Sequence, residues 1–391
     1  MKIVQINTVC GIGSTGRIVQ DISEILTKKG IENYIYYGQG KSSYKLAKKI
    51  GTNLDFRFHQ FMSRLTGKHG TYSKKATFKL VKDLEKIQPD VIHLHNIHGF
   101  YLNINILFEF FSRYDGKIIW TFHDCWPITG HCAYFDYVSC FKWQNGCSNC
   151  PQKKAYPITY LHDNSKQNWI TKKNIFTKVK NITICTPSNW LADTVKKSYL
   201  SKYPIRVIPN GVDLKLFHPY VRKNENEKPV ILAVANIWEE RKGLKDIIKI
   251  AKVLENEFDF IVIGKQYRSH YSAKNIKFIK QTNNIKELAQ YYSMADYFLN
   301  TTYEDNFPTT NIEALACGTP VITYDTGGSS ESAINKFCLV VEKGNSEKVI
   351  NFLKENKFKK NSNIVNDCFS CAYLNFNKFN NYNIYINLYY K

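Results

Sequence analysis

The sequence predicts an α/β protein made of two doubly wound, Rossmann-like domains, and three observations lead to this prediction. The 391 residues are enough for two domains of ordinary size. Each half alternates short apolar runs with amphipathic stretches, which is the pattern of parallel strands covered by helices. A stretch rich in Pro, Asn and charged residues separates the halves, as expected of a linker. The predicted parts are a first domain, a linker, a second domain, and a segment crossing back to the first domain, at 1–208, 209–228, 229–370 and 371–391.

The individual elements follow from apolar runs taken in chain order. In the first half, strands are expected at 3–6, 34–37, 91–94, 118–122 and 182–186. In the second half, strands are expected at 230–235, 260–264, 297–300 and 321–324, and helices at about 243–256, at about 285–293 and from about 309. Ligands of such sheets bind outside the carboxyl ends of the strands. Functional residues are therefore sought directly after strands, in a cleft that the two domains would share.

The composition excludes several classes of protein. Apolar residues make up 43% and charged residues 22% of the chain, which is typical of a folded globular protein and not of a disordered one. No stretch approaches the ~18–20 apolar residues of a membrane-spanning helix, and Gln5 and Asn7 interrupt the apolar start, unlike a secretory signal. We expect a cytoplasmic protein, either free or bound peripherally at the inner face of the cell membrane. The 11 cysteines are then expected to be reduced.

The net charge of +21 indicates an anionic partner, and the basic excess lies mainly in residues 1–200. Such a field attracts the phosphates of nucleic acid, anionic lipid or a phosphorylated substrate. One stretch, 56–86, interleaves apolar and basic side chains: Phe56, Phe58, Phe61 and Met62 with Arg57, Arg64, Lys68, Lys74, Lys75, Lys79, Lys82 and Lys86. This stretch predicts either a helix on an anionic membrane surface or an ordinary helix with a solvated lysine face.

The strand expected at 297–300 is followed by two acids at a suggestive spacing. Asp305 precedes Glu313 by eight positions, and Pro308 between them is a plausible helix start. The free amides at that start would form an anion site, and the carboxylates suit sugar and ribose hydroxyls. The pattern therefore indicates a nucleotide diphosphate-sugar, with further donor contacts from Asn306, Phe307, Thr309 and Thr310.

This segment resembles the signature of retaining glycosyltransferases of family 4, which have the GT-B fold of two Rossmann-like domains facing each other across a cleft. By that resemblance Asp305 contacts the transferred sugar and Glu313 the ribose. Residues 236–243 are similar to the family's Arg…Lys-Gly loop, which implies that Arg241 and Lys242 hold the diphosphate and stabilise it as a leaving group. The chain departs from the family pattern by having Asp at 305 in place of Glu and Pro308 in place of Gly.

Two features of the first half also match the family. A glycine-containing loop, Gly13, Ser14, Thr15 and Gly16, follows the first strand, where glycines allow a close approach to a ligand. It is expected to touch donor phosphate or acceptor, the alternative being a plain tight turn. His123 follows the strand at 118–122 and matches a His-Asp step that lines the donor-sugar pocket in related transferases, so it is assigned to the active site. His95 and His98 are weaker candidates, since a buried histidine is more often part of the core.

Five cysteines crowd into the predicted insertion 125–151. Four of them have the spacing of a structural zinc site: Cys132, Cys140, Cys147 and Cys150. The alternative is four reduced cysteines in a packed loop. With all four positions taken by sulfur, zinc would be structural, so no cofactor is expected for catalysis. A similar four-cysteine insertion occurs in family members associated with colanic acid and capsular polysaccharide.

The sequence thus predicts a retaining glycosyltransferase of surface polysaccharide biosynthesis (capsule, O-antigen or exopolysaccharide). It would move a hexose from a UDP- or GDP-sugar to a saccharide or lipid-linked saccharide acceptor, with no nucleic-acid partner. Two alternatives remain open at this point. One is a basic, zinc-containing nucleic-acid-binding protein, and the other is an inactive relative that binds a nucleotide-sugar.

Overall fold

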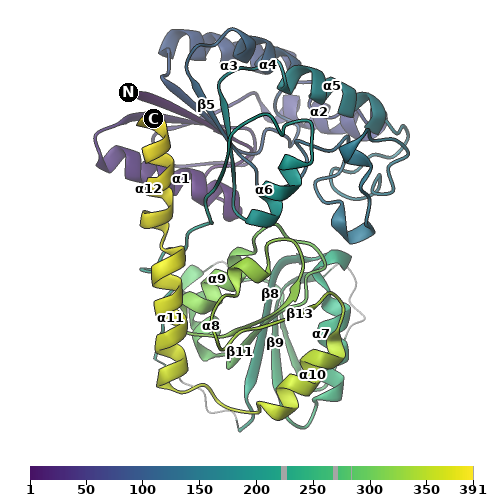
Figure 1. Cartoon of the computed structure of the whole chain (residues 1–391), viewed down its shortest axis with the longest axis vertical. Coiled ribbons are helices and arrows are strands. Elements are labelled where there is room, and N and C mark those ends of the chain that lie inside the picture. Colours follow the sequence, from purple (N-terminus) through teal and green to yellow (C-terminus); the bar gives the residue numbers. More distant parts are fainter. Residues whose placement is uncertain (222–226, 267–271, 283, 391) are drawn as a thin grey trace. The chain divides into compact units, whose positions relative to one another are not determined.

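The computed structural model describes residues 1–221, 227–266, 272–282 and 284–390. The chain forms two compact units, which are drawn in Figure 1. The first unit contains Met1–Ile208 together with the residues from Tyr382 onward, and the second contains Pro209–Asn381.

The first unit is built on a seven-stranded sheet whose paired strands all run parallel, in the order β3-β2-β1-β4-β5-β6-β7. The strands are β1 (Lys2–Asn7), β2 (Glu32–Tyr37), β3 (Ala47–Lys49), β4 (Val91–Leu94), β5 (Lys117–Thr121), β6 (Ile182–Thr186) and β7 (Ile205–Val207). The helices are α1 (Gly13–Lys28), α2 (Asn53–Thr66), α3 (Lys74–Ile87), α4 (Ile104–Ser112), α5 (Ser165–Phe176) and α6 (Asn189–Lys196). All five predicted strands are present, and the edge strands β3 and β7 are additional.

The second unit repeats the plan with six parallel strands in the order β10-β9-β8-β11-β12-β13. The strands are β8 (Val230–Trp238), β9 (Asp259–Gln266), β10 (Ile276–Ile279), β11 (Tyr297–Asn300), β12 (Val321–Asp325) and β13 (Leu339–Glu342). The helices are α7 (Leu244–Val253), α8 (Ile285–Met294), α9 (Thr309–Ala316), α10 (Ser346–Glu355) and α11 (Ser362–Phe376), and α12 (Lys378–Tyr390) follows. The predicted α/β class of two Rossmann-like units is confirmed.

Burial explains why the strands read as continuous apolar runs. Ile3, Val4 and Ile6 of β1 are all fully buried, because helices cover both faces of a parallel sheet. The helices instead bury one stripe each, as α1 does with Val19 and Ile22. Among the described residues, no helix has both the length and the apolar character needed to cross a bilayer.

The residues predicted to form a linker, 209–228, are partly packed against the second unit in the structure. Residues 209–221 pack into the second unit, where Val212 and Phe217 join the hydrophobic core and Val212 pairs with Asn377 in a β-bridge. An ion pair of 2.7 Å joins Asp213 to Lys378 at the start of α12. These residues are therefore part of the second unit and not a free linker, while 222–226 lie outside the described residues.

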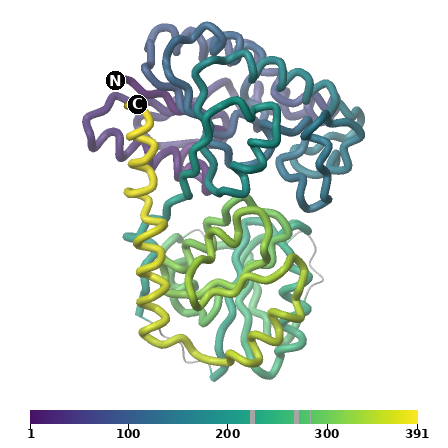
Figure 2. The backbone as a smooth tube through the Cα atoms, in the orientation of Figure 1, coloured from purple at the N-terminus to yellow at the C-terminus, as the bar shows by residue number. Residues whose placement is uncertain are grey.

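The C-terminal part of the chain also divides differently from the prediction. α11 and the start of α12 belong to the second unit, and the residues from Tyr382 belong to the first; both helices can be followed in Figure 2. Within the first unit, the Tyr389 hydroxyl lies 2.7 Å from His93 Nδ1, and the Tyr385 ring packs 5.0 Å from the His93 ring.

The basic stretch 56–86 is likewise not a single helix. It forms the C-terminal part of α2 and most of α3, because Gly67 ends α2 in a left-handed conformation with φ of 70°. A Cβ at Gly67 would lie 2.3 Å from the carbonyl oxygen of His162, so only glycine fits there.

Candidate functional site

In the second unit, three loops meet at the carboxyl ends of neighbouring strands. The loops follow β8, β11 and β12, which lie side by side in the sheet. The Tyr303 N–H donates to the Arg241 carbonyl at 2.7 Å, and the Gly328 N–H donates to the Asp305 carbonyl at 3.1 Å. These backbone bonds fix the loop after β11 between the other two.

Two glycines allow this close packing of backbones. Gly243 has a φ of +72°, and a Cβ there would lie 2.0 Å from the Thr301 carbonyl oxygen. Gly327 has a φ of +56°, and a Cβ there would lie 1.9 Å from the Asp305 carbonyl oxygen. Any other residue would push the loops apart, so the position of Asp305 depends on both glycines.

Lys242 and Asp305 form an ion pair at the meeting point of the loops. Lys242 Nζ lies 2.6 Å from Asp305 Oδ2, and the two side chains are 22% and 19% exposed. Burial acts to raise the pKa of Asp305, but the charges of Lys242 and Arg241 outweigh it and hold that pKa below its ordinary value. Arg241 lies beside them, with Nη1 donating to the Glu304 carbonyl at 3.1 Å and Nε to a Glu239 carboxylate oxygen at 3.1 Å.

Helix α9 begins next to this pair, and the N–H of its third residue, Asn311, donates to the Pro308 carbonyl at 3.2 Å. Its N-cap is Pro308, no side chain caps it, and no acidic residue lies in its first turn. Thr309 and Thr310, both half-buried, form that first turn. A helix start of this kind attracts anions through its N–H groups and its dipole. The helix start that the sequence predicts after β11 is present, and its role in binding an anion stays a prediction.

Glu313 lies within α9 and is 7% exposed. The hydroxyl of Tyr292, from α8, donates to Glu313 Oε2 at 3.0 Å. This bond orients the carboxylate.

Phe307, one of the predicted donor contacts, has a buried side chain. Its side chain is 5% exposed and packs in the core of the second unit, with its ring 5.9 Å from that of Phe376. The Phe307 side chain therefore supports the loop, and only its backbone N–H points to the site, donating to Asp305 Oδ1 at 3.2 Å. The neighbouring Asn306 is also buried, at 3% exposure.

In the first unit, the predicted glycine loop is the first turn of α1. Gly13, Ser14, Thr15 and Gly16 are all helical, and their helix has neither a side-chain cap nor an acid in its first turn. Gly16 is packed tightly, since a Cβ there would lie 3.0 Å from Val9 Cγ2. The segment thus offers helix amides to an anion, rather than the loop backbone that the sequence suggested.

The predicted histidines gather at the ends of β4 and β5 in the first unit. His123 Nε2 lies 3.0 Å from His95 Nδ1, and their rings stack at 5.3 Å. Burial lowers the pKa of His123 to about 4, so the ring is neutral at pH 7. His98 Nε2 lies 2.7 Å from Asp124 Oδ2, and both side chains are buried. The structure therefore brings all three histidines together and adds Asp124.

The four predicted zinc ligands line one small cavity of about 10 Å³. The Cys132 and Cys150 thiols are hydrogen-bonded to each other, and the Gly130 N–H donates to Cys147 Sγ at 3.1 Å. Among the described residues, however, no three Cys, His, Asp or Glu side chains are arranged to hold a metal ion. The sulfur donors suit Zn²⁺, and the cysteines have converged without adopting a ligand geometry.

Sequence reasoning missed Tyr292 and Asp124. Tyr292 lies on a different helix from Glu313, so no local sequence pattern links the two residues. The sequence around Tyr292 predicts only that it belongs to an amphipathic helix. Asp124 follows His123 directly after a strand, and this position was itself a signal that it lies at the site.

The fold and these loops define the class of the protein, a GT-B glycosyltransferase. The structure of Anabaena Alr3699/HepE in complex with UDP aligns with a TM-score of 0.67 and 14% identity over 99% of each chain, which shows the shared fold. The pattern of Glycosyltransferase Family 4 matches residues 15–216, and that of Glycosyl transferases group 1 matches residues 219–366. The chain belongs to glycosyltransferase family 4.

Two curated relatives extend this result. The putative colanic acid biosynthesis glycosyl transferase WcaC of Escherichia coli K12 is 23% identical over 356 residues, covering 85% of each chain. The N,N'-diacetylbacillosaminyl-diphospho-undecaprenol alpha-1,3-N-acetylgalactosaminyltransferase of Campylobacter jejuni is 26% identical over 166 residues, covering 37% of this chain and 43% of that protein. Of the three readings of the sequence, the glycosyltransferase is the one these comparisons support.

Proposed function

We propose that this chain is a retaining glycosyltransferase that moves a hexose from a UDP- or GDP-sugar to a saccharide acceptor in surface polysaccharide biosynthesis. The observation that carries the proposal is the Lys242–Asp305 pair beside the uncapped start of α9, with Glu313 one turn further along. The likeness to a colanic acid transferase supports the polysaccharide product, and the UDP held by Anabaena HepE supports a UDP-sugar.

In the proposed reaction the enzyme supplies position and charge. The bond between the anomeric carbon and the donor diphosphate breaks, and the acceptor hydroxyl forms a new bond on the same face of the sugar. The acceptor proton passes to the departing phosphate oxygen. Lys242, Arg241 and the α9 amides stabilise the negative charge on the leaving diphosphate. Asp305 contacts the sugar, and Glu313 holds the ribose.

Glu313→Ala is expected to weaken donor binding by about 10–100-fold. The substitution removes the charged carboxylate that would accept hydrogen bonds from the ribose hydroxyls. The measurement is thermal unfolding against a panel of UDP- and GDP-sugars. A donor at ~100 times its Kd adds about 2.7 kcal/mol to the free energy of unfolding, enough to raise Tm visibly. The matched control is Glu347→Ala, at an exposed position in the first turn of α10.

Three results would overturn parts of this proposal. A Tm that rises with single-stranded DNA and with no nucleotide-sugar would favour the nucleic-acid-binding alternative. Donor binding with no turnover on any saccharide would point to an inactive relative. A product whose anomeric configuration is opposite to that of the donor, measured by NMR, would replace retention by inversion.

We also propose that Cys132, Cys140, Cys147 and Cys150 hold a structural zinc ion. Their convergence on one cavity supports this, together with a nearby buried lysine. Lys172 Nζ donates to the Trp126 and Thr129 carbonyls at 2.8 and 3.0 Å. Four thiolates around Zn²⁺ carry net negative charge, which a buried ammonium would offset. The role of zinc here would be to fix the insertion, with no part in the reaction.

The zinc proposal predicts about one Zn²⁺ per chain in protein purified without chelator, measured by elemental analysis. Cys150→Ser is expected to lose most of the metal, while Cys371→Ser in α11 of the second unit keeps it. Substitution by Co²⁺ should give the visible absorption of tetrahedral thiolate ligation. A metal-free protein whose eleven thiols all react after unfolding would contradict it.

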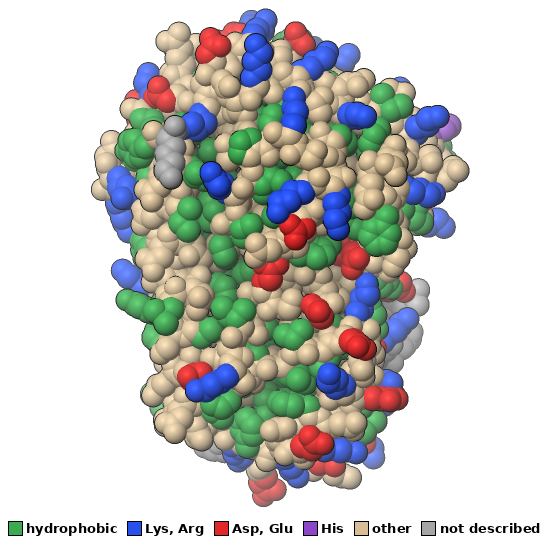
Figure 3. All heavy atoms as spheres, in the orientation of Figure 1, with side chains coloured by type: hydrophobic (Ala, Val, Ile, Leu, Met, Phe, Trp, Pro, Cys, Tyr) green, Lys and Arg blue, Asp and Glu red, His purple; other side chains and the backbone are tan. Residues whose placement is uncertain are grey.

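The acceptor is proposed to be lipid-linked and the chain to work at an anionic membrane surface. The Campylobacter relative, whose name includes a diphospho-undecaprenol acceptor, supports the first part. The net charge of +21 supports the second. In Figure 3, Lys and Arg side chains are spread over both units with Asp and Glu between them, so on that face the charge is dispersed. A membrane contact would therefore need a local cluster of basic or apolar side chains.

A further inference from the structure

A small cavity of about 230 Å³ lies in the first unit where β2 ends, and we name it the β2 cavity. Gly38, Gln39 and Gly40 follow β2 directly and line it. Its other lining residues are Lys49, Asn53, Phe56 and Arg57. Ligands of parallel sheets bind at the carboxyl ends of the strands, so the cavity lies where this fold places its ligands. Its volume is below the ~300–1,000 Å³ of drug-sized pockets, which suits one sugar ring and not a whole nucleotide.

Hydrogen bonds hold the wall of the β2 cavity against the loop that contains His98. The Gln39 N–H donates to the Thr8 carbonyl at 2.7 Å, and the Thr8 hydroxyl donates to the His98 carbonyl at 2.6 Å. Gly40 lies against Ile12, the N-cap of α1, since a Cβ at Gly40 would lie 3.2 Å from Ile12 Cδ1. The cavity therefore borders both features of the first unit that the sequence assigned to the site, the histidines and the start of α1.

The β2 cavity carries positive charge that no carboxylate in its lining offsets. Lys49 Nζ donates to the Gly40 carbonyl at 3.1 Å and to Asn53 Oδ1 at 2.7 Å, and both of these acceptors are neutral. Arg57 is exposed, and within the part of the chain that the structure describes it has no hydrogen-bond or ion-pair partner. No Asp or Glu is among the described residues that line the cavity. An anionic ligand is therefore expected there.

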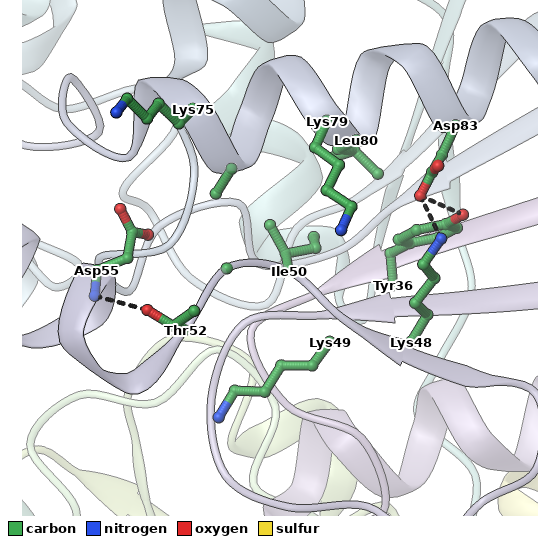
Figure 4. A pocket seen from close by; sticks show the side chains of 12 residues that line it. Tyr36, Lys48, Lys49, Ile50, Thr52, Asp55, Lys75, Lys79, Leu80 and Asp83 are labelled. Atoms are coloured by element: carbon green, nitrogen blue, oxygen red, sulfur yellow. Dashed lines mark hydrogen bonds and ion pairs between the residues drawn. The ribbon is translucent and has the colours of Figure 1, made fainter.

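A larger cavity next to it, of about 390 Å³, has a different charge balance. It shares Lys49 with the β2 cavity, but the carboxylates of Asp55 and Asp83 also line it, and Asp83 is paired with Lys48. In Figure 4, which shows this larger cavity, the Lys49 side chain points away from Lys79. The Lys49 ammonium group therefore serves the β2 cavity, and a lining without carboxylates distinguishes that cavity from its neighbour.

The remaining lining groups suit the rest of a sugar molecule. Phe56 is half-buried, and its ring is held by an edge-on contact with the Phe100 ring at 6.2 Å. Such a ring offers a rigid apolar face to the C–H groups of a sugar. Gln39 and Asn53 add side-chain amides, which can donate to and accept from hydroxyl groups. An aromatic face and amides beside two cations fit a sugar that bears a carboxylate better than they fit bare phosphate.

We propose that the β2 cavity binds an acidic sugar of the saccharide acceptor, a hexose unit that bears a carboxylate, such as a uronic acid. Arg57 and Lys49 hold the carboxylate, to which the guanidinium group can donate two parallel hydrogen bonds. Gln39 and Asn53 contact the hydroxyl groups, and the sugar ring lies against Phe56. The inference rests on the proposed transferase and names the chemical class of its acceptor.

The experiment compares two probes that differ at a single carbon, glucuronate and glucose, by saturation-transfer NMR on the full-length protein. Wild type is expected to bind glucuronate about 10-fold more tightly than glucose, since hydrogen bonds between charged groups contribute this much. Arg57→Gln should remove this preference and leave glucose binding unchanged. The matched control, Arg113→Gln, removes the same charge from an exposed position after α4 and should change either affinity by less than about twofold.

A second variant of the same cavity, Lys49→Gln, should also lose the preference for glucuronate. Equal affinity of wild type for the two probes, or binding of neither, would overturn the proposal. Equal losses in Arg57→Gln and Arg113→Gln would overturn it too, because they would reduce the effect to net charge. Inorganic phosphate that displaces glucuronate and binds as tightly would replace the acidic sugar by a general anion site.

The Tm response to nucleotide-sugars, measured on the same variants, separates this inference from the proposed transferase. A donor response in wild type and in Arg57→Gln, without any preference for glucuronate, would remove only the acidic acceptor. Absence of a donor response in wild type would count against the transferase, whatever the result with glucuronate.

Discussion

Replacing Lys242 with methionine is expected to lower kcat/KM by about 10²–10³-fold. The ammonium group lies 2.6 Å from Asp305 at the meeting point of three loops, and in the proposed reaction its fixed positive charge stabilises the departing diphosphate. Removing one such preorganised group typically costs this much in rate. Methionine keeps most of the length of the side chain, so the loss reports the charge. The measurement is steady-state transfer with the donor identified by thermal unfolding.

The control for this variant is Lys245→Met, at an exposed position three residues further along the chain in α7. It should retain wild-type kcat/KM within about twofold, since surface substitutions have small effects. The positive charge of Lys242 lowers the pKa of Asp305 and so counteracts the effect of burial, which raises it. In Lys242→Met the pKa of Asp305 should therefore rise. Unchanged turnover in Lys242→Met would remove Lys242 from the reaction.

The second large effect is expected on lowering the pH from 7 to 5, where the first unit should lose on the order of 10 kcal/mol of its free energy of unfolding. Burial lowers the pKa of six histidines there: that of His59 and His93 to about 3, that of His123 and His131 to about 4, and that of His69 and His95 well below 6.5. In the unfolded chain these histidines become protonated below pH 6.5, whereas in the folded chain they stay neutral down to about pH 4. The stability that they contribute is therefore complete above pH 6.5 and is lost as the pH falls toward 4.

The His95–His123 contact shows why the folded unit resists these protons. One nitrogen of the pair must accept a hydrogen bond from the other, and two protonated rings would present donors to each other. Asp124 acts to raise the pKa of His123, but its carboxylate is already bonded to His98. Carboxylates with ordinary pKa values titrate below this window, so the loss between pH 7 and 5 reports the histidines.

Tryptophan emission can follow this loss in the first unit alone. Five of the six tryptophans lie within residues 1–208, and Trp238→Phe removes the sixth. Urea unfolding of that variant should give a free energy that falls steeply between pH 6.5 and 5. Adding His59→Gln should reduce the slope by about a sixth, whatever it does to stability at pH 7. A free energy independent of pH across this range would contradict the prediction.

Most of the fold follows from local sequence because its strands are short apolar runs bounded by turn residues. β11 lies at Tyr297–Asn300 and α9 begins at Thr309, as the sequence predicts. The edge strand β3 was missed because its sequence, Ala-Lys-Lys, carries no apolar run. Such a strand is defined by pairing with β2, which local patterning does not report.

The candidate site was predictable only where its residues are close in sequence. Asp305, the start of α9 and Glu313 lie on one continuous segment, so their spacing placed them. The bond from Tyr292 to Glu313 joins two helices that no local sequence pattern connects. The burial of the Phe307 side chain could not be predicted, because a motif gives the position of a side chain without its direction. Tertiary packing decides these features.

The residues from Tyr382 have a consequence for how the chain is made. They belong to the first unit, where Tyr389 bonds to His93 in β4. During translation the first unit leaves the ribosome early, but it must wait for the whole second unit to be synthesised before its last helix arrives. At ordinary elongation rates this delay is on the order of 10–40 s. During that interval the surface around His93 that binds Tyr389 is uncovered in the nascent first unit. Such exposed surface is what chaperones bind.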